Sequence, residues 1–162
     1  MIERIHAYLS AEKQESLLFI AVGVAAILIA AWLWMNGHRL KAMAFPLIGV
    51  ALIQLVVGGT VYLRSDKQAA DLAAQAASQP AEFNAAETAR MAPVMKNFTL
   101  YKWIEIGLLA AGVLLIVLLP SQAIAAGIGA GLVLQSGIML CLDVFAEERG
   151  QAYLDALGAF AR

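Results

Sequence analysis

Apolar residues follow one another along this chain in long uninterrupted blocks, and polar residues gather at the two ends and in one central stretch. The first two blocks cover residues 17–35 and 43–63, and the third runs from 103 to 143 with a break at Pro120. A helix needs about 20 apolar residues to cross a hydrocarbon core of about 30 Å. The first two blocks therefore predict one membrane crossing each, and the third predicts two.

These blocks predict an all-α membrane protein, a four-helix transmembrane bundle made of two tight helical hairpins in one domain over residues 1–162. The expected spans cover about 17–35, 43–63, 103–119 and 122–143. Short turns at Asn36–Arg39 and Pro120–Ser121 join the spans in pairs, which makes the members of each pair antiparallel neighbours. Composition agrees, because 14% of the residues are charged against about 25% in soluble domains.

Residues 64–102 form the one long polar stretch in the interior of the chain, with nine charged residues. Its first part is rich in alanine, the best helix former, so we expect the second spanning helix to continue out of the membrane. Pro80 then predicts a break. Asn84 and Glu87 have the spacing of a capping box, which predicts the start of a returning helix. The stretch is interpreted as a cytoplasmic helical hairpin.

The returning arm of this hairpin carries an apolar stripe at positions i, i+3, i+4 and i+7. It consists of Met91, Val94, Met95 and Phe98. One interpretation is a plain spacer, in which the stripe packs on the other arm of the hairpin. The other is an exposed docking surface, because flexible methionine side chains suit adaptable binding. The pattern alone leaves both open.

Both ends of the chain have short amphipathic patterns outside the spans. Ile2, Ile5, Tyr8 and Leu9 recur at helical spacing before the first span, and Tyr153, Leu154, Leu157 and Phe160 recur after the last. Each pattern predicts a short amphipathic terminal helix that lies in the membrane interface.

The distribution of basic residues predicts the orientation of the bundle. Four crossings put both termini and the 64–102 hairpin on one side of the membrane. That side holds nine of the eleven Lys and Arg residues, at positions 4, 13, 64, 67, 90, 96, 102, 149 and 162. The positive-inside rule then predicts a multi-pass membrane protein with both termini in the cytoplasm.

Two polar amides are expected near the middle of the membrane. Gln135 follows Ala123, Gly127 and Gly131 at intervals of four residues, so these side chains share one helix face. Small residues at that spacing allow two helices to approach closely in lipid. On the second helix, Gln54 precedes Gly58 by the same interval. The two amides are candidates either for a bond between helices or for a partner or substrate site at the midplane.

Charged residues occur at the ends of the third and fourth spans. Lys102 precedes Glu105 by three residues, a spacing at which helical side chains meet. Asp143 is expected at the same interface, about 30 Å along the fourth helix from Ser121. Lys102, Glu105 and Asp143 are therefore predicted to form an interfacial ion pair, with a proton carrier at Glu105 as the alternative.

Several kinds of chemistry find no support in the residues. The net charge of −1 gives no reason to expect a nucleic-acid partner. Cys141 is the only cysteine, so an intrachain disulfide and two-cysteine redox chemistry are excluded, and we expect its side chain to be buried. No metal-ligand cluster, nucleophile elbow or phosphate loop occurs. We therefore expect neither a cofactor nor an enzyme.

By elimination, the sequence favours a protein that works by contact with lipid and with another protein. In architecture alone it resembles small polytopic bacterial membrane proteins that protect a cell from pore-forming toxins. This resemblance implies an immunity protein of the bacterial inner membrane that neutralises a pore-forming or membrane-targeting toxin from within the bilayer. The alternatives are an accessory or assembly subunit of a larger membrane complex, or a small channel or transporter subunit. A homo-oligomer is compatible with each of these functions.

Overall fold

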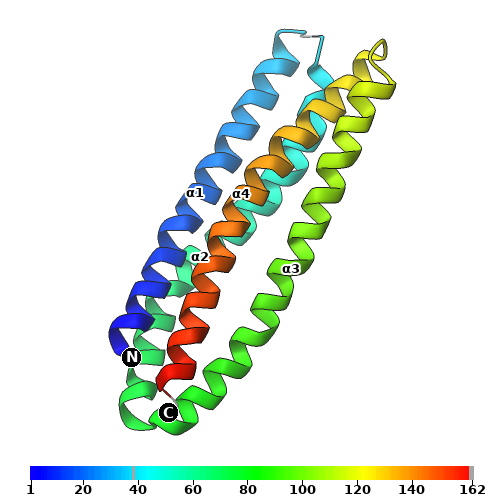
Figure 1. The fold of residues 1–162 in the computed structure, drawn as a ribbon. Coiled ribbons are helices and arrows are strands. Elements are labelled where there is room, and N and C mark those ends of the chain that lie inside the picture. The colour runs from blue at the N-terminus through cyan, green and yellow to red at the C-terminus, as the bar shows by residue number, and fades with distance from the viewer. Residues whose placement is uncertain (38, 161–162) are drawn as a thin grey trace.

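Four long helices make up nearly the whole molecule in the computed structural model, which describes residues 1–37 and 39–160. They are α1 (Ile2–Met35), α2 (Ala44–Ser78), α3 (Pro80–Leu118) and α4 (Ala123–Phe160), with the short 3₁₀ helix η1 (Lys41–Met43) before α2. The helices run antiparallel along the chain and form an elongated bundle (Figure 1). Each of the four is long and apolar enough to cross a membrane. The predicted all-α four-helix membrane bundle is confirmed, while His38 of the predicted first turn lies outside the described residues.

Each helix is longer than a membrane requires. The 34 residues of α1 correspond to about 51 Å at 1.5 Å per residue, against a hydrocarbon core of about 30 Å. The amphipathic segments at the two ends of the chain are helical, and they continue α1 and α4 without a break. Helix formers such as Ala11, Glu12 and Lys13 connect the first segment to its span. The two segments are therefore extensions of the spanning helices and not separate helices.

The break between α2 and α3 falls at Gln79, inside the region where the sequence predicts it. The predicted start of the returning helix at Asn84 is wrong, because α3 already begins at Pro80. Proline is favoured in the first turn of a helix, where its missing N–H costs nothing. Asn84 lies within α3, and its side-chain amide donates to the backbone oxygen of Leu157, 2.7 Å away.

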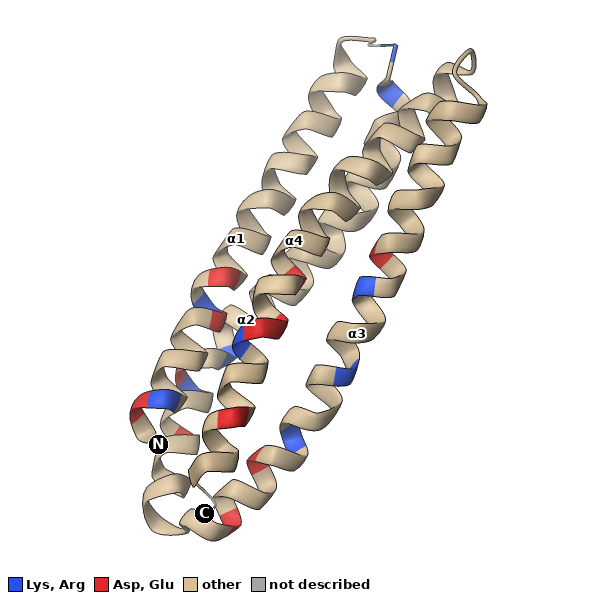
Figure 2. Cartoon of the chain, viewed as in Figure 1, with Lys and Arg blue, Asp and Glu red and all other residues tan. Residues whose placement is uncertain are grey.

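Charge divides the bundle into two halves along its length (Figure 2). We call residues 1–16, 64–102 and 144–160 the charged half, and residues 17–63 and 103–143 the membrane half. The charged half contains both termini and the turn between α2 and α3 (Figure 1). Ion pairs between helices lie where the halves meet: Lys13–Asp66, Arg64–Glu12, Arg149–Glu15 and Lys102–Glu147. These pairs are at least partly exposed to solvent, and such pairs add little stability each. Their main use here is to mark the boundary between the two halves.

The charged half has a core of large side chains contributed by all four helices. Its buried members are Ile5, Leu9, Leu72, Ala76, Phe83, Met91, Tyr153 and Leu157. Because all four helices bury apolar side chains in one common core, this half is packed like a water-soluble four-helix bundle.

In the membrane half α4 lies between α2 and α3. Its glycines meet η1 and α2 on one side and α3 on the other, whereas the backbone of α3 does not approach that of α1 anywhere in the described residues. Of the described residues in the spanning part of α3, only Glu105 and Gly112 are buried. The helix stands to one side of the bundle over this length (Figure 1). The membrane half is therefore an open arrangement with α3 at its edge.

Candidate functional site

The two intramembrane glutamines lie together between α2 and α4. The Nε2 of Gln135 is 3.4 Å from the Oε1 of Gln54 and 3.4 Å from the backbone oxygen of Leu47. The Nε2 of Gln54 is 3.1 Å from the sulfur of Met139. Gln54 is 0% exposed and Gln135 is 1% exposed. Both amides are thus occupied inside the bundle, and neither offers a surface to a partner.

The glycines in the membrane-spanning part of the fourth helix, among them Gly127 and Gly131 of the predicted face, meet two different neighbours. A Cβ at Gly131 would lie 2.5 Å from the Cγ of Pro46, and one at Gly127 would lie 3.1 Å from the backbone nitrogen of Met43. Gly129 instead meets α3, where a Cβ would lie 2.6 Å from the backbone oxygen of Gly112. At Gly58 the close neighbour is α1, not α4. All of these glycines therefore contribute to packing within the bundle.

The predicted ion pair between Lys102 and Glu105 does not form. The amino group of Lys102 pairs with Glu147 of α4, on the side of the charged half. Glu105 lies one helical turn further into the membrane half than Lys102 and faces α4. Its carboxyl group lies within hydrogen-bonding reach of Asp143. Spacing along one helix brought Lys102 and Glu105 together in the prediction, but the neighbouring helix supplied a better partner for the lysine. The result is an ion pair next to a pair of carboxyl groups.

The interpretation of the methionine stripe as an exposed docking surface is wrong. Met91 is 0% exposed and belongs to the core of the charged half. Val94 and Met95 pack against this core from the same helix, and Phe98 is partly buried. The stripe is covered because the terminal segments of α1 and α4 continue into this half. The sequence pattern had instead predicted that those segments lie in the membrane interface.

A buried polar network in the charged half was missed by the sequence reasoning. Glu87 is 2% exposed, receives two bonds of 2.7 Å from Arg90, and accepts a bond of 3.1 Å from the hydroxyl of Tyr153. Tyr8 stacks on Tyr153, with ring centroids 4.4 Å apart. Burial raises the pKa of Tyr8 to about 12, and burial with the negative charge of Glu87 raises the pKa of Tyr153. The three-residue spacing of Glu87 and Arg90 was a usable signal for the first contact.

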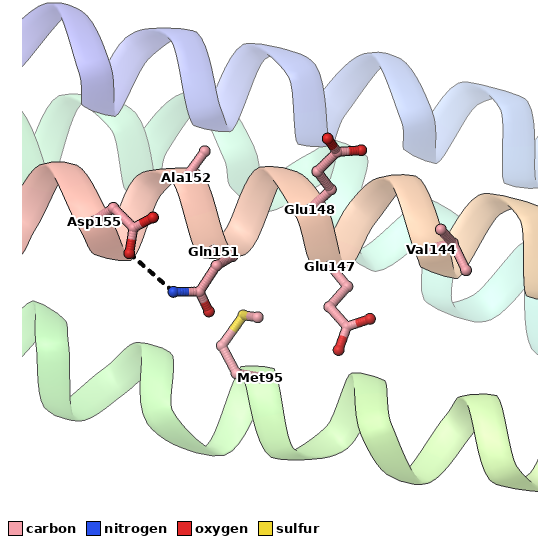
Figure 3. Close-up of a pocket in the computed structure, with 7 residues that line it drawn as sticks. All are labelled: Met95, Val144, Glu147, Glu148, Gln151, Ala152 and Asp155. Atoms are coloured by element: carbon pink, nitrogen blue, oxygen red, sulfur yellow. Dashed lines mark hydrogen bonds between the residues drawn. The ribbon is translucent and has the colours of Figure 1, made fainter.

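An open groove lies beside α4 in the charged half, facing α3 (Figure 3). It is lined by Met95 of α3 and by Val144, Glu147, Glu148, Gln151, Ala152 and Asp155 of α4. Figure 3 shows these side chains pointing in several directions, with Gln151 bonded to Asp155 at 2.9 Å. Nothing in the groove converges on a common point, so its geometry does not define a binding site.

Cys141 is exposed, so the prediction that it is buried is wrong. Within residues 1–37 and 39–160, no group of three or more His, Cys, Asp or Glu side chains is placed to hold a metal ion.

The outer face of α3 is a further feature that the sequence prediction missed. Ile104, Gly107, Ala111, Leu114 and Leu118 share a helix face directed away from α4, and all five are exposed. Gly107 and Ala111 have the four-residue spacing of small residues at membrane helix contacts. A Cβ at Gly107 would meet no atom within 4 Å. The same spacing drew attention to the fourth helix, and applied to the third it would have found this face.

No family model, curated protein or solved structure matches the chain.

Proposed function

We propose that this chain is a non-catalytic membrane protein that binds a protein partner within the bilayer through the outer face of α3. The observation that carries the proposal is the pair of exposed small residues, Gly107 and Ala111, on the least covered helix. At Gly58, Gly112, Gly129 and Gly131, a glycine lies where a neighbouring helix comes close. Gly107 and Ala111 have no such neighbour, and they leave room for one additional helix, because small residues let two backbones approach closely.

The surroundings of this face fit a helical partner. Ile104, Leu114 and Leu118 flank the two small residues and provide side chains that would pack around an incoming helix. The amides of Gln54 and Gln135 are already bonded to groups inside the bundle. Recognition on this face therefore rests on shape and close packing. That mode of recognition needs no cofactor and no catalytic group.

For the identity of the partner, the proposal is a membrane-targeting or pore-forming toxin, which makes this chain an immunity protein of the bacterial inner membrane. A toxin helix held against α3 would be unavailable for pore assembly. The excess of Lys and Arg in the charged half supports a cytoplasmic location for both termini. An accessory subunit of a larger complex would use the same face, and the identity of the protein bound there separates the two functions.

The binding test compares Gly107→Leu with Gly49→Leu. A Cβ at either glycine meets no atom of the bundle within 4 Å, so both variants should fold and accumulate like the original chain. Cells that express the original chain or Gly49→Leu should resist a membrane toxin encoded beside this gene. Gly107→Leu should lose at least about tenfold in protection, equivalent to about 1.4 kcal/mol of binding. Equal protection by both variants would exclude the α3 face.

A photo-crosslinking residue at Leu114 identifies the partner directly. Capture of the toxin supports immunity, and capture of a resident membrane complex replaces immunity with the accessory function. Capture of a second copy of this chain would make α3 a homo-oligomer interface. Lipid adducts alone would refute a protein partner.

Orientation has its own test. A phosphatase reporter, which is active only outside the cytoplasm, should be inactive when fused at Ala77 and active when inserted at Gly37. The opposite pattern would invert the proposed topology.

A further inference from the structure

Two buried carboxyl groups from different helices meet where the membrane half begins. Glu105 of α3 is 6% exposed and Asp143 of α4 is 5% exposed. Their carboxyl groups lie within hydrogen-bonding reach of each other. In addition, the Oε2 atom of Glu105 is buried without a hydrogen-bond partner. A buried acceptor without a partner is costly in a folded protein, so this arrangement calls for a positive ligand.

The charged groups near Glu105 and Asp143 already form ion pairs with one another. Lys102 of α3 and Glu147 of α4 are the neighbours whose charges reach Asp143, and they form an ion pair. On the α1 side, Glu15 is paired with Arg149, and on the α2 side Arg64 is paired with Glu12. These pairs cancel in charge, which leaves Glu105 and Asp143 without a counter-ion of their own.

We propose that Glu105 and Asp143 form a proton-binding site in which the two carboxyl groups share one proton. Two ionised carboxylates in contact repel each other strongly, and a shared proton removes one charge and supplies the donor for a hydrogen bond between them. A proton needs only the two oxygens that face each other. A metal ion would need several additional ligands, and the described residues provide no third His, Cys, Asp or Glu grouped with this pair.

The site links the protonation state to the attachment of α3. Along its spanning part α3 packs on α4, with the close contact at Gly112 and Gly129 and the carboxyl pair at the boundary. With the proton bound, the pair fastens α3 to α4. Loss of the proton places two like charges between the helices and loosens α3 at this end. This inference does not depend on the proposed partner.

Infrared spectroscopy of the whole protein in nanodiscs tests the proton directly. At neutral pH the original chain should show the C=O stretch of a protonated carboxyl group, and Glu105→Gln should lack it. Asp143→Asn gives an independent check from the other helix. Glu148→Gln is the matched control, because this exposed acid lies on α4 outside the pair, and it should keep the signal. Absence of the stretch from the original chain at neutral pH would overturn the proposal.

The pH dependence of thermal stability provides a second readout, and thermodynamic linkage determines its direction. A folded state that holds a proton more tightly than the unfolded state loses stability as pH rises. The original chain should therefore melt at lower temperatures as pH rises from about 6 to about 9, a range above the ordinary values of free carboxyl groups. Glu105→Gln, whose amide imitates the protonated acid, should remove this dependence. An unchanged dependence in that variant, or a melting temperature that follows sodium concentration at constant pH, would contradict a proton site.

Discussion

The two halves of this bundle consist of the same four helices, yet different side chains hold them together. In the charged half, large residues such as Leu9, Phe83 and Leu157 fill the core. In the membrane half, glycine and alanine occupy most buried positions, and Gly112 and Gly129 bring two backbones into contact. Water drives large apolar groups together. Lipid is as apolar as leucine, so helices in it associate through close van der Waals packing instead. The size of the buried residues thus records which solvent surrounds each half.

The largest expected effect comes from removing volume in the charged half. Leu157 is 0% exposed in its core, and Leu157→Ala should lower the free energy of unfolding by about 2–5 kcal/mol. Phe160→Ala is the control, because Phe160 is 43% exposed near the end of the same helix and should have a much smaller effect. Thermal melts in mild detergent measure both. Equal melting temperatures for the two variants would mean that this half has no packed core.

Adding volume should harm the membrane half. A side chain at Gly131 would collide with Pro46 and with the backbone of Met43, so we expect Gly131→Leu to cost about 1–3 kcal/mol. Gly49→Leu is the control, since it adds the same side chain where a Cβ meets nothing within 4 Å. The yield of folded protein and the melting temperature report the difference. A stable Gly131→Leu variant would show that this face of α4 meets lipid.

High pH should destabilise the charged half by a smaller amount, because one tyrosine lies in its core and another packs against it. The pKa of Tyr8 is raised to about 12, and burial and Glu87 also raise the pKa of Tyr153. A tyrosine whose folded pKa lies above its unfolded value of about 10 contributes stability below pH 10 that disappears as pH rises toward 12. The charged half should therefore loosen above about pH 10. In an absorbance titration, Tyr8→Phe should remove one of two late-titrating tyrosines, and an unchanged late phase would contradict the buried network.

The sequence was sufficient to predict the number and type of the helices and the break near Pro80, because these features depend on local apolar length and on proline. Contacts between helices were harder to predict. Spacing along one helix suggested a pair between Lys102 and Glu105, but the lysine pairs with Glu147 on the neighbouring helix. Met91 was a candidate for an exposed surface, and its burial depends on terminal segments far away in the sequence. One-dimensional spacing cannot report which helix lies opposite.

We conclude that the four helices continue from lipid into water without a break and form a common core there. The most direct measurement places single spin labels along residues 147–160 of a Cys141→Ala protein in nanodiscs and compares their accessibility to a water-soluble nickel chelate and to oxygen. We expect nickel accessibility with helical periodicity, high at exposed positions such as Gln151 and Asp155, and protection from both reagents at Tyr153 and Leu157. High oxygen accessibility at Tyr153 and Leu157 would mean that the segment lies in the membrane surface, and would contradict this conclusion.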